Sequence, residues 1–105
     1  MNLSHNIVDK LMEIPDIKET DGQKNPTAHL KFFNPLGAGT WYVTEMGATE
    51  DSQGKPDVLF FGYVESPLGD DLNEWGYFTL SQIIDTGIIE LDNYFEPQPI
   101  KNLIT

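Results

Sequence analysis

The 105-residue sequence predicts one α+β domain with a mostly antiparallel sheet of four or five strands and an N-terminal helix packed on one face. Three observations carry this prediction. Apolar residues recur at helical spacing near the N-terminus, and five pairs of adjacent aromatic residues follow in short strand-like segments. The length suits a single hydrophobic core. We therefore divide the domain into a helix at 4–14, a polar loop at 16–27 and a β-rich acidic body at 29–105.

The first element is an amphipathic helix over residues 4–14. Ser4 stands at the N-cap position, and Pro15 ends the helical pattern. One face of this helix is apolar and is formed by Leu3, Ile7, Val8, Leu11 and Met12. The segment 16–27 that follows is polar and contains Gly22 and Pro26, which is typical of a loop.

The strands of the acidic body are marked by five aromatic doublets, each bounded by turn-forming residues. They are Phe32-Phe33, Trp41-Tyr42, Phe60-Phe61, Tyr77-Phe78 and Tyr94-Phe95. Adjacent residues of a strand point to opposite faces of a sheet, so the doublets place aromatic rings on both faces. The N-terminal helix can cover one face. Loops, a second helix or a partner must cover the other, and we favour loops.

The end of the chain predicts a second helix and a last strand. Ser81 is the expected cap of a helix opening at 80–81, and Gly87 ends it. Residues 88–96 alternate, which predicts a strand whose apolar face holds Ile89, Leu91 and Phe95. Residues 100–104 are expected to form a last short helical turn or a docking tail. The expected core consists of Trp41 or its neighbour Val43, with Phe61, Ile89, Leu91 and Phe95.

The net charge of −11 is confined to the second half of the chain. From Glu45 to Glu96 there are twelve acidic residues and one basic residue, Lys55, and the sequence contains no arginine. Such a field repels nucleic acid and anionic membranes and attracts basic partners. The chain has no cysteine, no secretory signal and no apolar segment long enough to span a bilayer, so we expect a cytoplasmic protein.

Four segments resemble a family of small bacterial and mobile-element proteins, the domain of unknown function 2958. They are GTWYVTE at 39–45, FGYV at 61–64, EWGYFTLS at 74–81 and ELDNYFEP at 90–97. Their order and spacing run through about the last 70% of the chain. The resemblance implies an α+β fold and a plasmid, transposon or phage setting. It implies no catalytic residues.

Two short motifs invite a ligand-binding interpretation, and both fail on spacing. Asp70, Asp71, Asn73 and Glu74 form the densest group of oxygen ligands, but Trp75 and Gln82 occupy positions where a calcium-binding EF-hand loop requires ligands. We therefore interpret 70–74 as a solvated acidic turn and expect no metal. The glycines at 37 and 39 lead into a strand and lack the helix that a phosphate loop opens, so we expect a hairpin turn and no cofactor.

Candidate catalytic groups are sparse, and we expect the protein not to be an enzyme. His5 and His29 are the two histidines, and neither lies in a ligand or nucleophile motif. Two alternatives remain open. One is a small carboxylate-dependent enzyme in which two of Glu45, Glu74 and Glu90 meet as acid and base. The other is a metal-tuned binding module.

The sequence favours a small acidic module that binds a basic protein partner. The most specific version of this hypothesis is nucleic-acid mimicry, in which the protein inhibits a nucleic-acid-binding or defence enzyme. Carboxylates two apart on a strand lie about 6.8 Å apart, close to two phosphate steps of about 3.4 Å. Glu90, Asp92 and Glu96 fit such a row on one strand face, with Tyr94 between them. The expected partner-binding residues are Glu90, Asp92, Tyr94, Glu96, Asp70, Asp71 and Glu74. We expect no direct contact with nucleic acid or membrane.

Overall fold

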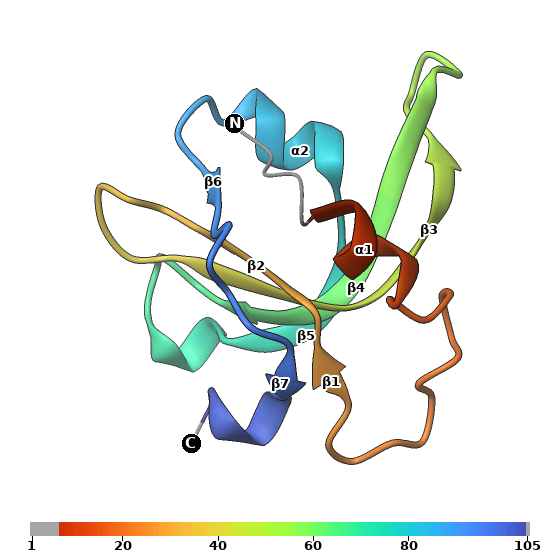
Figure 1. The fold of residues 1–105 in the computed structure, drawn as a ribbon. Coiled ribbons are helices and arrows are strands. Elements are labelled where there is room, and N and C mark those ends of the chain that lie inside the picture. Colours follow the sequence, from red (N-terminus) through yellow and green to blue (C-terminus); the bar gives the residue numbers. More distant parts are fainter. Residues whose placement is uncertain (1–6, 105) are drawn as a thin grey trace.

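The computed structural model describes residues 7–104, apart from the side chains of Ile7, Val8 and Asp70. Figure 1 shows the order of the elements along the chain. They are α1 (Ile7–Met12), β1 (Thr27–Ala28), β2 (Leu30–Phe33), β3 (Thr40–Glu50), β4 (Pro56–Glu65), η1 (Asp70–Leu72), β5 (Glu74–Thr79), α2 (Leu80–Asp85), β6 (Glu90–Leu91), β7 (Gln98–Pro99) and η2 (Ile100–Asn102).

The core of the fold is a five-stranded antiparallel sheet with the strand order β5-β4-β3-β2-β6. This confirms the predicted α+β class and the predicted sheet. Four of the five aromatic doublets lie in its strands β2, β3, β4 and β5. β1 pairs with β7 in a separate two-residue ladder, which ties the start of the β-rich body to the end of the chain.

A β-bulge interrupts the long β3–β4 hairpin at Thr44, between Val43 and Glu45. The partner strand passes very close to β3 at this point. A Cβ built on Gly62 would lie 1.7 Å from the carbonyl oxygen of Tyr42, so only glycine fits there. Bulges bend a strand and increase its twist. In Figure 1 the far end of this hairpin rises away from the rest of the sheet.

The two faces of the sheet carry different apolar clusters. We call the first the α2 face: Phe32, Val43, Phe60 and Phe78 are buried there, together with Ile83 of α2. The opposite face carries a smaller cluster of Ala28, Tyr42, Phe95 and Ile100. Figure 1 shows α2 on one side of the sheet and β1, β7 and η2 on the other. The helix α2 thus covers part of one face of the sheet, and β1, β7 and η2 cover part of the other (Figure 1).

The predicted last strand over 88–96 is wrong, since β6 contains only Glu90 and Leu91. The Asp92 side chain accepts a hydrogen bond from the Tyr94 N–H at 2.9 Å, and the Asp92 carbonyl accepts one from Phe95, which turns the chain. Ile89 and Leu91 therefore pack on the α2 face, whereas Phe95 packs on the opposite face.

The predicted core is otherwise largely correct. Val43, Ile89, Leu91 and Phe95 are buried, and Trp41 packs against the α2-face cluster. Phe61 is the exception, because Phe60 of the same doublet is the buried ring and Phe61 is half-buried.

The second helix is confirmed at 80–85, but its cap is Thr79 and not Ser81. The Thr79 hydroxyl accepts from the Gln82 N–H, and the Gln82 side chain accepts from the Thr79 N–H, which is a complete capping box. Gly87 adopts a positive φ of 73° just beyond this helix. The predicted hairpin turn at 37–39 joins β2 to β3, and the predicted last helical turn is η2.

The N-terminal helix is described from Ile7 to Met12, within the predicted range 4–14. Leu11 packs against the α2-face cluster, and the Lys10 ammonium donates to the Phe95 carbonyl at 2.6 Å. The segment 16–27 contains no helix or strand until β1 begins at Thr27. Among residues 7–104, no helix is long and apolar enough to cross a membrane.

Candidate functional site

The carboxylates of the acidic body fall into two groups, according to whether the fold uses them. Five are held by neighbouring groups of the protein itself: Glu45, Asp51, Asp57, Glu65 and Asp92. Six are exposed at the surface: Glu50, Asp71, Glu74, Asp85, Glu90 and Glu96. The second group faces solvent.

Glu45 is the most buried of the held carboxylates, with 1% of its surface exposed. It accepts hydrogen bonds from the Lys18 N–H at 2.7 Å, from the Thr20 N–H at 2.8 Å and from the Thr20 hydroxyl. Burial alone would raise the pKa of Glu45, but these hydrogen bonds outweigh it and lower the pKa. Glu45 therefore fastens the 16–27 loop to the sheet and is not accessible at the surface.

Three other acidic residues shape the backbone. The Asp57 carboxylate accepts hydrogen bonds from the hydroxyl and the backbone N–H of Ser81. The hydrogen bond from the hydroxyl is the main cause that lowers the pKa of Asp57. Through these bonds Asp57 holds the first turn of α2 in place. Asp51 accepts from the Lys55 N–H at 2.9 Å and closes the β3–β4 turn. Asp92 forms the turn after β6, as described above.

Glu65 is paired with a buried tyrosine. Burial, with the neighbouring charge of Glu65 and a hydrogen bond to it, raises the pKa of Tyr42 to about 12. Tyr42 therefore stays a neutral donor to Glu65 at physiological pH.

The exposed carboxylates have little internal compensation. Among the side chains that the structure describes, one ion pair is found, between Lys31 and Asp92 at 4.0 Å. Lys55 is the one cation between residues 45 and 96. The negative field of this half of the molecule thus extends into solvent largely uncancelled.

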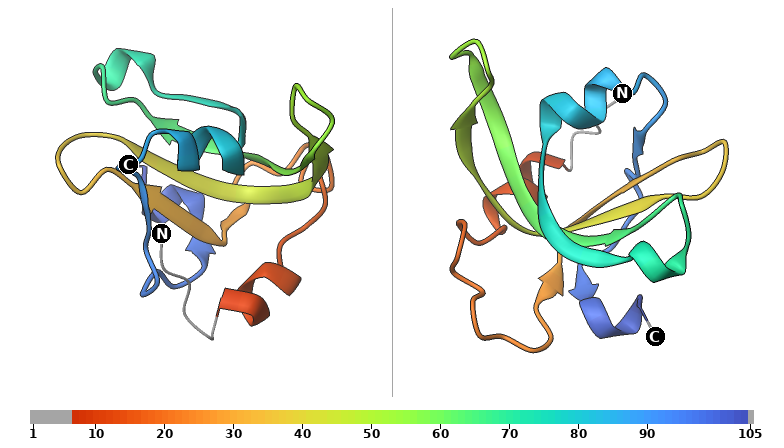
Figure 2. Two further views of the ribbon diagram at one scale, coloured as in Figure 1. Left: turned by 90° about the horizontal axis from the view of Figure 1, so that it is seen from above. Right: turned by 180° about the vertical axis from the view of Figure 1, so that it is seen from behind.

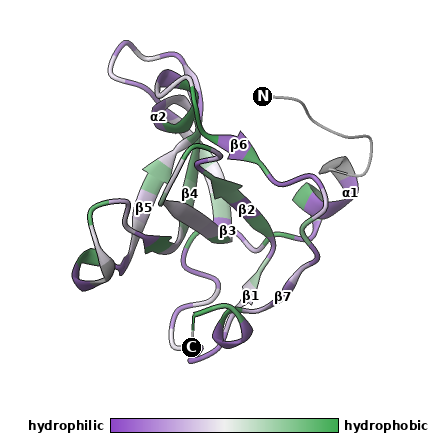
Figure 3. Cartoon of the chain, turned by 90° about the vertical axis from the view of Figure 1, so that its left-hand side faces the viewer, coloured by the Kyte–Doolittle hydropathy of each residue, from purple (hydrophilic) through white to green (hydrophobic). Residues whose placement is uncertain are grey.

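The residues predicted to bind a partner are divided between opposite edges of the sheet. Asp71 and Glu74 lie in η1 and β5, at one edge, and Glu90 lies in β6, at the other. Figure 3 shows hydrophilic residues at η1 and on β6. Asp70 belongs to η1, but its side chain lies outside the described residues.

The predicted row of Glu90, Asp92 and Glu96 on one strand face is wrong. β6 ends at Leu91, Asp92 bends the chain, and Glu96 follows the buried Phe95. Tyr94 projects from this turn with 92% of its surface exposed. The strand spacing that suggested a match to phosphate steps therefore does not exist here.

The acidic turn at 66–73 is organised by its own side chains. The Ser66 N–H donates to Asn73 Oδ1 at 2.7 Å, and the Leu68 N–H donates to the Ser66 hydroxyl at 3.0 Å. Asn73, one of the four oxygen-bearing residues considered for calcium, thus directs its carbonyl oxygen to the backbone. Within the described residues, no group of three or more metal-ligating side chains is found.

An aromatic cluster lies on β4 and β5, on the part of the opposite face that β1, β7 and η2 leave uncovered. Phe61 stacks on Trp75 with ring centroids 5.9 Å apart and meets Tyr77 at 4.9 Å. Tyr63 meets Trp75 edge-to-face at 5.5 Å. Trp75 and Tyr77 are 39% and 55% exposed. We call Phe61, Tyr63, Trp75 and Tyr77 the β5 aromatic cluster.

The family model for proteins of unknown function DUF2958 matches residues 3–100, nearly the whole chain. The chain belongs to this family. No curated protein and no solved structure matches it. The resemblance seen in the sequence is thus confirmed, and it extends further toward the N-terminus than the four segments that revealed it.

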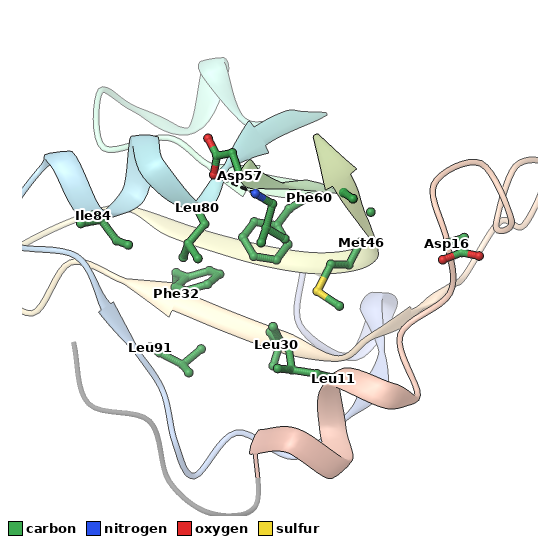
Figure 4. Close-up of a pocket in the computed structure, with 13 residues that line it drawn as sticks. Leu11, Asp16, Leu30, Phe32, Met46, Asp57, Phe60, Leu80, Ile84 and Leu91 are labelled. Atoms are coloured by element: carbon green, nitrogen blue, oxygen red, sulfur yellow. Dashed lines mark hydrogen bonds between the residues drawn. The ribbon is translucent and has the colours of Figure 1, made fainter. Parts of the chain in front are cut away.

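An apolar cavity of about 580 Å³ lies on the α2 face of this DUF2958 protein. Figure 4 shows Leu30, Phe32, Phe60 and Leu91 turned toward it. Its carboxylates are Asp16 and Asp57, and Asp57 is engaged with Ser81. The cavity therefore offers apolar contact and little polar chemistry.

The residues considered for catalysis are not brought together in the described part of this DUF2958 chain. Glu45, Glu74 and Glu90 lie on β3, β5 and β6, the last two at opposite edges of the sheet. The His29 N–H donates to the Val43 carbonyl, while its ring Nδ1 is buried with no hydrogen-bond partner, and burial lowers the pKa of its side chain. His5 lies outside the described residues.

The β5 aromatic cluster is the feature that sequence reasoning missed. A signal for it exists, since Trp75 and Tyr77 alternate in the segment EWGYFT and must share a face of the strand. The aromatic doublets pointed to rings on both faces but could not indicate which rings remain uncovered.

Proposed function

We propose that this protein is a small acidic binding module that docks on a basic protein partner. The observation that carries the proposal is the set of six exposed carboxylates in a half of the chain that contains one lysine. Complementary potentials steer two proteins together and raise the rate of association. A basic surface supplies the cations that residues 45–96 lack apart from Lys55.

The partner that suits this field best is a protein that itself binds nucleic acid, because such proteins carry clustered lysine and arginine. Occupying that surface would inhibit the partner. Support for this step comes from charge alone, since the acidic row predicted for β6 does not form. Competition with DNA is therefore the deciding measurement.

The fold that presents this surface includes the N-terminal helix, which we infer packs on the α2 face. Leu11 supports this, because it lines the apolar cavity beside Leu30 and Leu91. Ile14, just after the helix, is buried in the same cluster.

The proposal is tested with three variants, each of which removes two negative charges. The β5-edge variant is Asp71→Asn with Glu74→Gln, and the β6-edge variant is Glu90→Gln with Glu96→Gln. The matched control is Glu19→Gln with Asp21→Asn, at exposed positions of the 16–27 loop. Because only exposed groups change, all three should keep the thermal midpoint of the wild type.

Immobilised wild-type protein and the three variants are compared for capture from a nuclease-treated bacterial lysate at about 0.05 M salt. We expect a basic nucleic-acid-binding protein on the wild type, released by duplex DNA and by about 0.5 M salt. At least one edge variant should retain about three- to tenfold less of it, while the control retains the wild-type amount. Equal loss on the control, or capture that survives high salt, contradicts the proposal.

A further inference from the structure

The strand β5 forms an open edge of the sheet. It pairs with β4 over its whole length, from Glu74↔Val64 to Thr79↔Leu59, and no strand pairs with its outer side in the part of the chain that the structure describes. In an antiparallel ladder, every second residue of an edge strand directs its N–H and C=O groups outward. Figure 2 shows β5 running from α2 to η1 along the outside of the molecule.

This edge lacks the features that usually protect such strands. Edge strands are commonly blocked by lysine, proline or a bulge. The segment EWGYFT contains neither lysine nor proline, and its register with β4 is unbroken. A Cβ built on Gly76, in the middle of the strand, would meet nothing within 4 Å. The edge of β5 is therefore blocked by none of these three features, and Gly76 leaves the sheet face above the middle of the strand open.

The side chains around β5 determine which kind of incoming strand can pair with it. Trp75 and Tyr77 are exposed on one face of the sheet, and aromatic rings attract arginine and lysine side chains. Glu74 and Asp71 lie at the start of the strand, and no lysine or arginine occurs between residues 56 and 100. A second copy of this chain fits poorly, because it would bring the same carboxylates and a second charge of −11 to the edge.

We propose that β5 binds an extended basic segment of a partner protein, which adds to the sheet as a sixth strand and places cationic side chains on the β5 aromatic cluster. The backbone pairing holds the segment, and the alternate cationic side chains recognise the rings and Glu74. This inference rests on the proposed function, since it names the place and the mode in which the basic partner docks.

The test uses a defined probe, a nine-residue peptide of alternating arginine and valine with both ends capped. Isotope-labelled protein is titrated with this peptide, and the affected backbone amides are mapped. The first control peptide is N-methylated at every residue, so that it keeps the side chains and charge but cannot pair as a strand. The second control replaces arginine by glutamate.

We expect shifts concentrated on 74–79, and binding at least about tenfold weaker for both control peptides. Replacing Trp75 and Tyr77 together by Thr should weaken binding about tenfold while keeping strand propensity. The matched control is Met12→Thr, at an apolar residue of α1 with 80% of its surface exposed, which should bind as the wild type does. The mapping on wild-type protein does not depend on the folding of any variant.

The outcomes separate this inference from the proposed function. Equal binding of the N-methylated peptide, with shifts spread over many acidic sites, overturns docking on β5 but leaves the acidic module standing. No binding of either cationic peptide contradicts both. A β5–β5 dimer of the free protein in ultracentrifugation overturns the basic occupant, because the edge is then filled by a second copy.

Discussion

At the scale of single residues, Glu45 shows how one acidic side chain can serve the fold in a strongly acidic chain. Its carboxylate receives the backbone N–H groups of Lys18 and Thr20 together with the Thr20 hydroxyl. Hydrogen bonds to a charged group contribute more than neutral ones, and a buried carboxylate that loses a donor keeps its desolvation cost. The loop 16–27 is thus attached to β3 at this point.

Replacing Thr20 by Val should lower the free energy of unfolding at pH 7 by about 1–3 kcal/mol, since one donor to the buried carboxylate is lost. The lowered pKa of Glu45 gives the loss a pH dependence. Stability from these bonds is present above the ordinary value of 4.5 and disappears as the pH falls through the lowered one. Urea unfolding at neutral and acid pH should show a smaller difference between variant and wild type in acid.

Thr49→Val is the matched control, since Thr49 is half-buried on β3 and makes no hydrogen bond with its side chain in the described structure. It should change the stability by no more than about 0.5 kcal/mol. If Thr20→Val is equally mild, the Thr20 hydroxyl does not hold the loop.

At the scale of elements, the strands could be predicted because aromatic doublets between turn residues are a local signal. That signal identified β2, β3, β4 and β5 but could not assign the faces. The choice between Phe60 and Phe61 depends on which face α2 covers, which is a tertiary contact. The doublet Tyr94-Phe95 is not in a strand, because the Asp92 side chain makes a turn that competes with alternation.

The candidate site could likewise be predicted only in its local features. The excess of acidic residues was evident from the sequence, but which carboxylates are exposed was not. Glu45 and Asp57 look like any other acidic residue until the loop and α2 bring their donors to them. The sheet order, which separates Glu74 from Glu90, is also a long-range property.

The bulge in β3 gives a prediction at this scale. Gly62→Ala places a methyl group against the Tyr42 carbonyl oxygen, at 1.7 Å before any relaxation, so the two strands must move apart. We expect a loss of about 3 kcal/mol or more in the free energy of unfolding. Gly76→Ala is the matched control, with open space around its Cβ, and should be neutral or stabilising by up to about 1 kcal/mol.

Chemical denaturation of both variants measures the difference. Similar midpoints for Gly62→Ala and Gly76→Ala would show that the backbone at the bulge relaxes freely, and the close approach would then not explain the glycine.

At the scale of the whole molecule, the charge that suits a basic partner opposes the folded state of the free protein. A compact chain with a net charge of −11 and few ion pairs repels itself. Partner binding and stability are thus linked, since a cationic segment on β5 or at η1 would relieve the repulsion while adding contacts. Binding should therefore also raise the thermal midpoint.

Salt tests this self-repulsion directly. Screening weakens it, so the thermal midpoint of the free protein should rise by about 5 °C between roughly 0.02 M and 0.3 M sodium chloride, which corresponds to about 1 kcal/mol for a domain of this size. Replacing Glu50 and Asp85, both exposed, by Gln and Asn should raise the midpoint at low salt and flatten the rise. Calorimetry at several salt concentrations measures both effects. A midpoint that falls as salt is added would mean that attractive pairs outweigh the repulsion, and the exposed carboxylates would then already be satisfied without a basic partner.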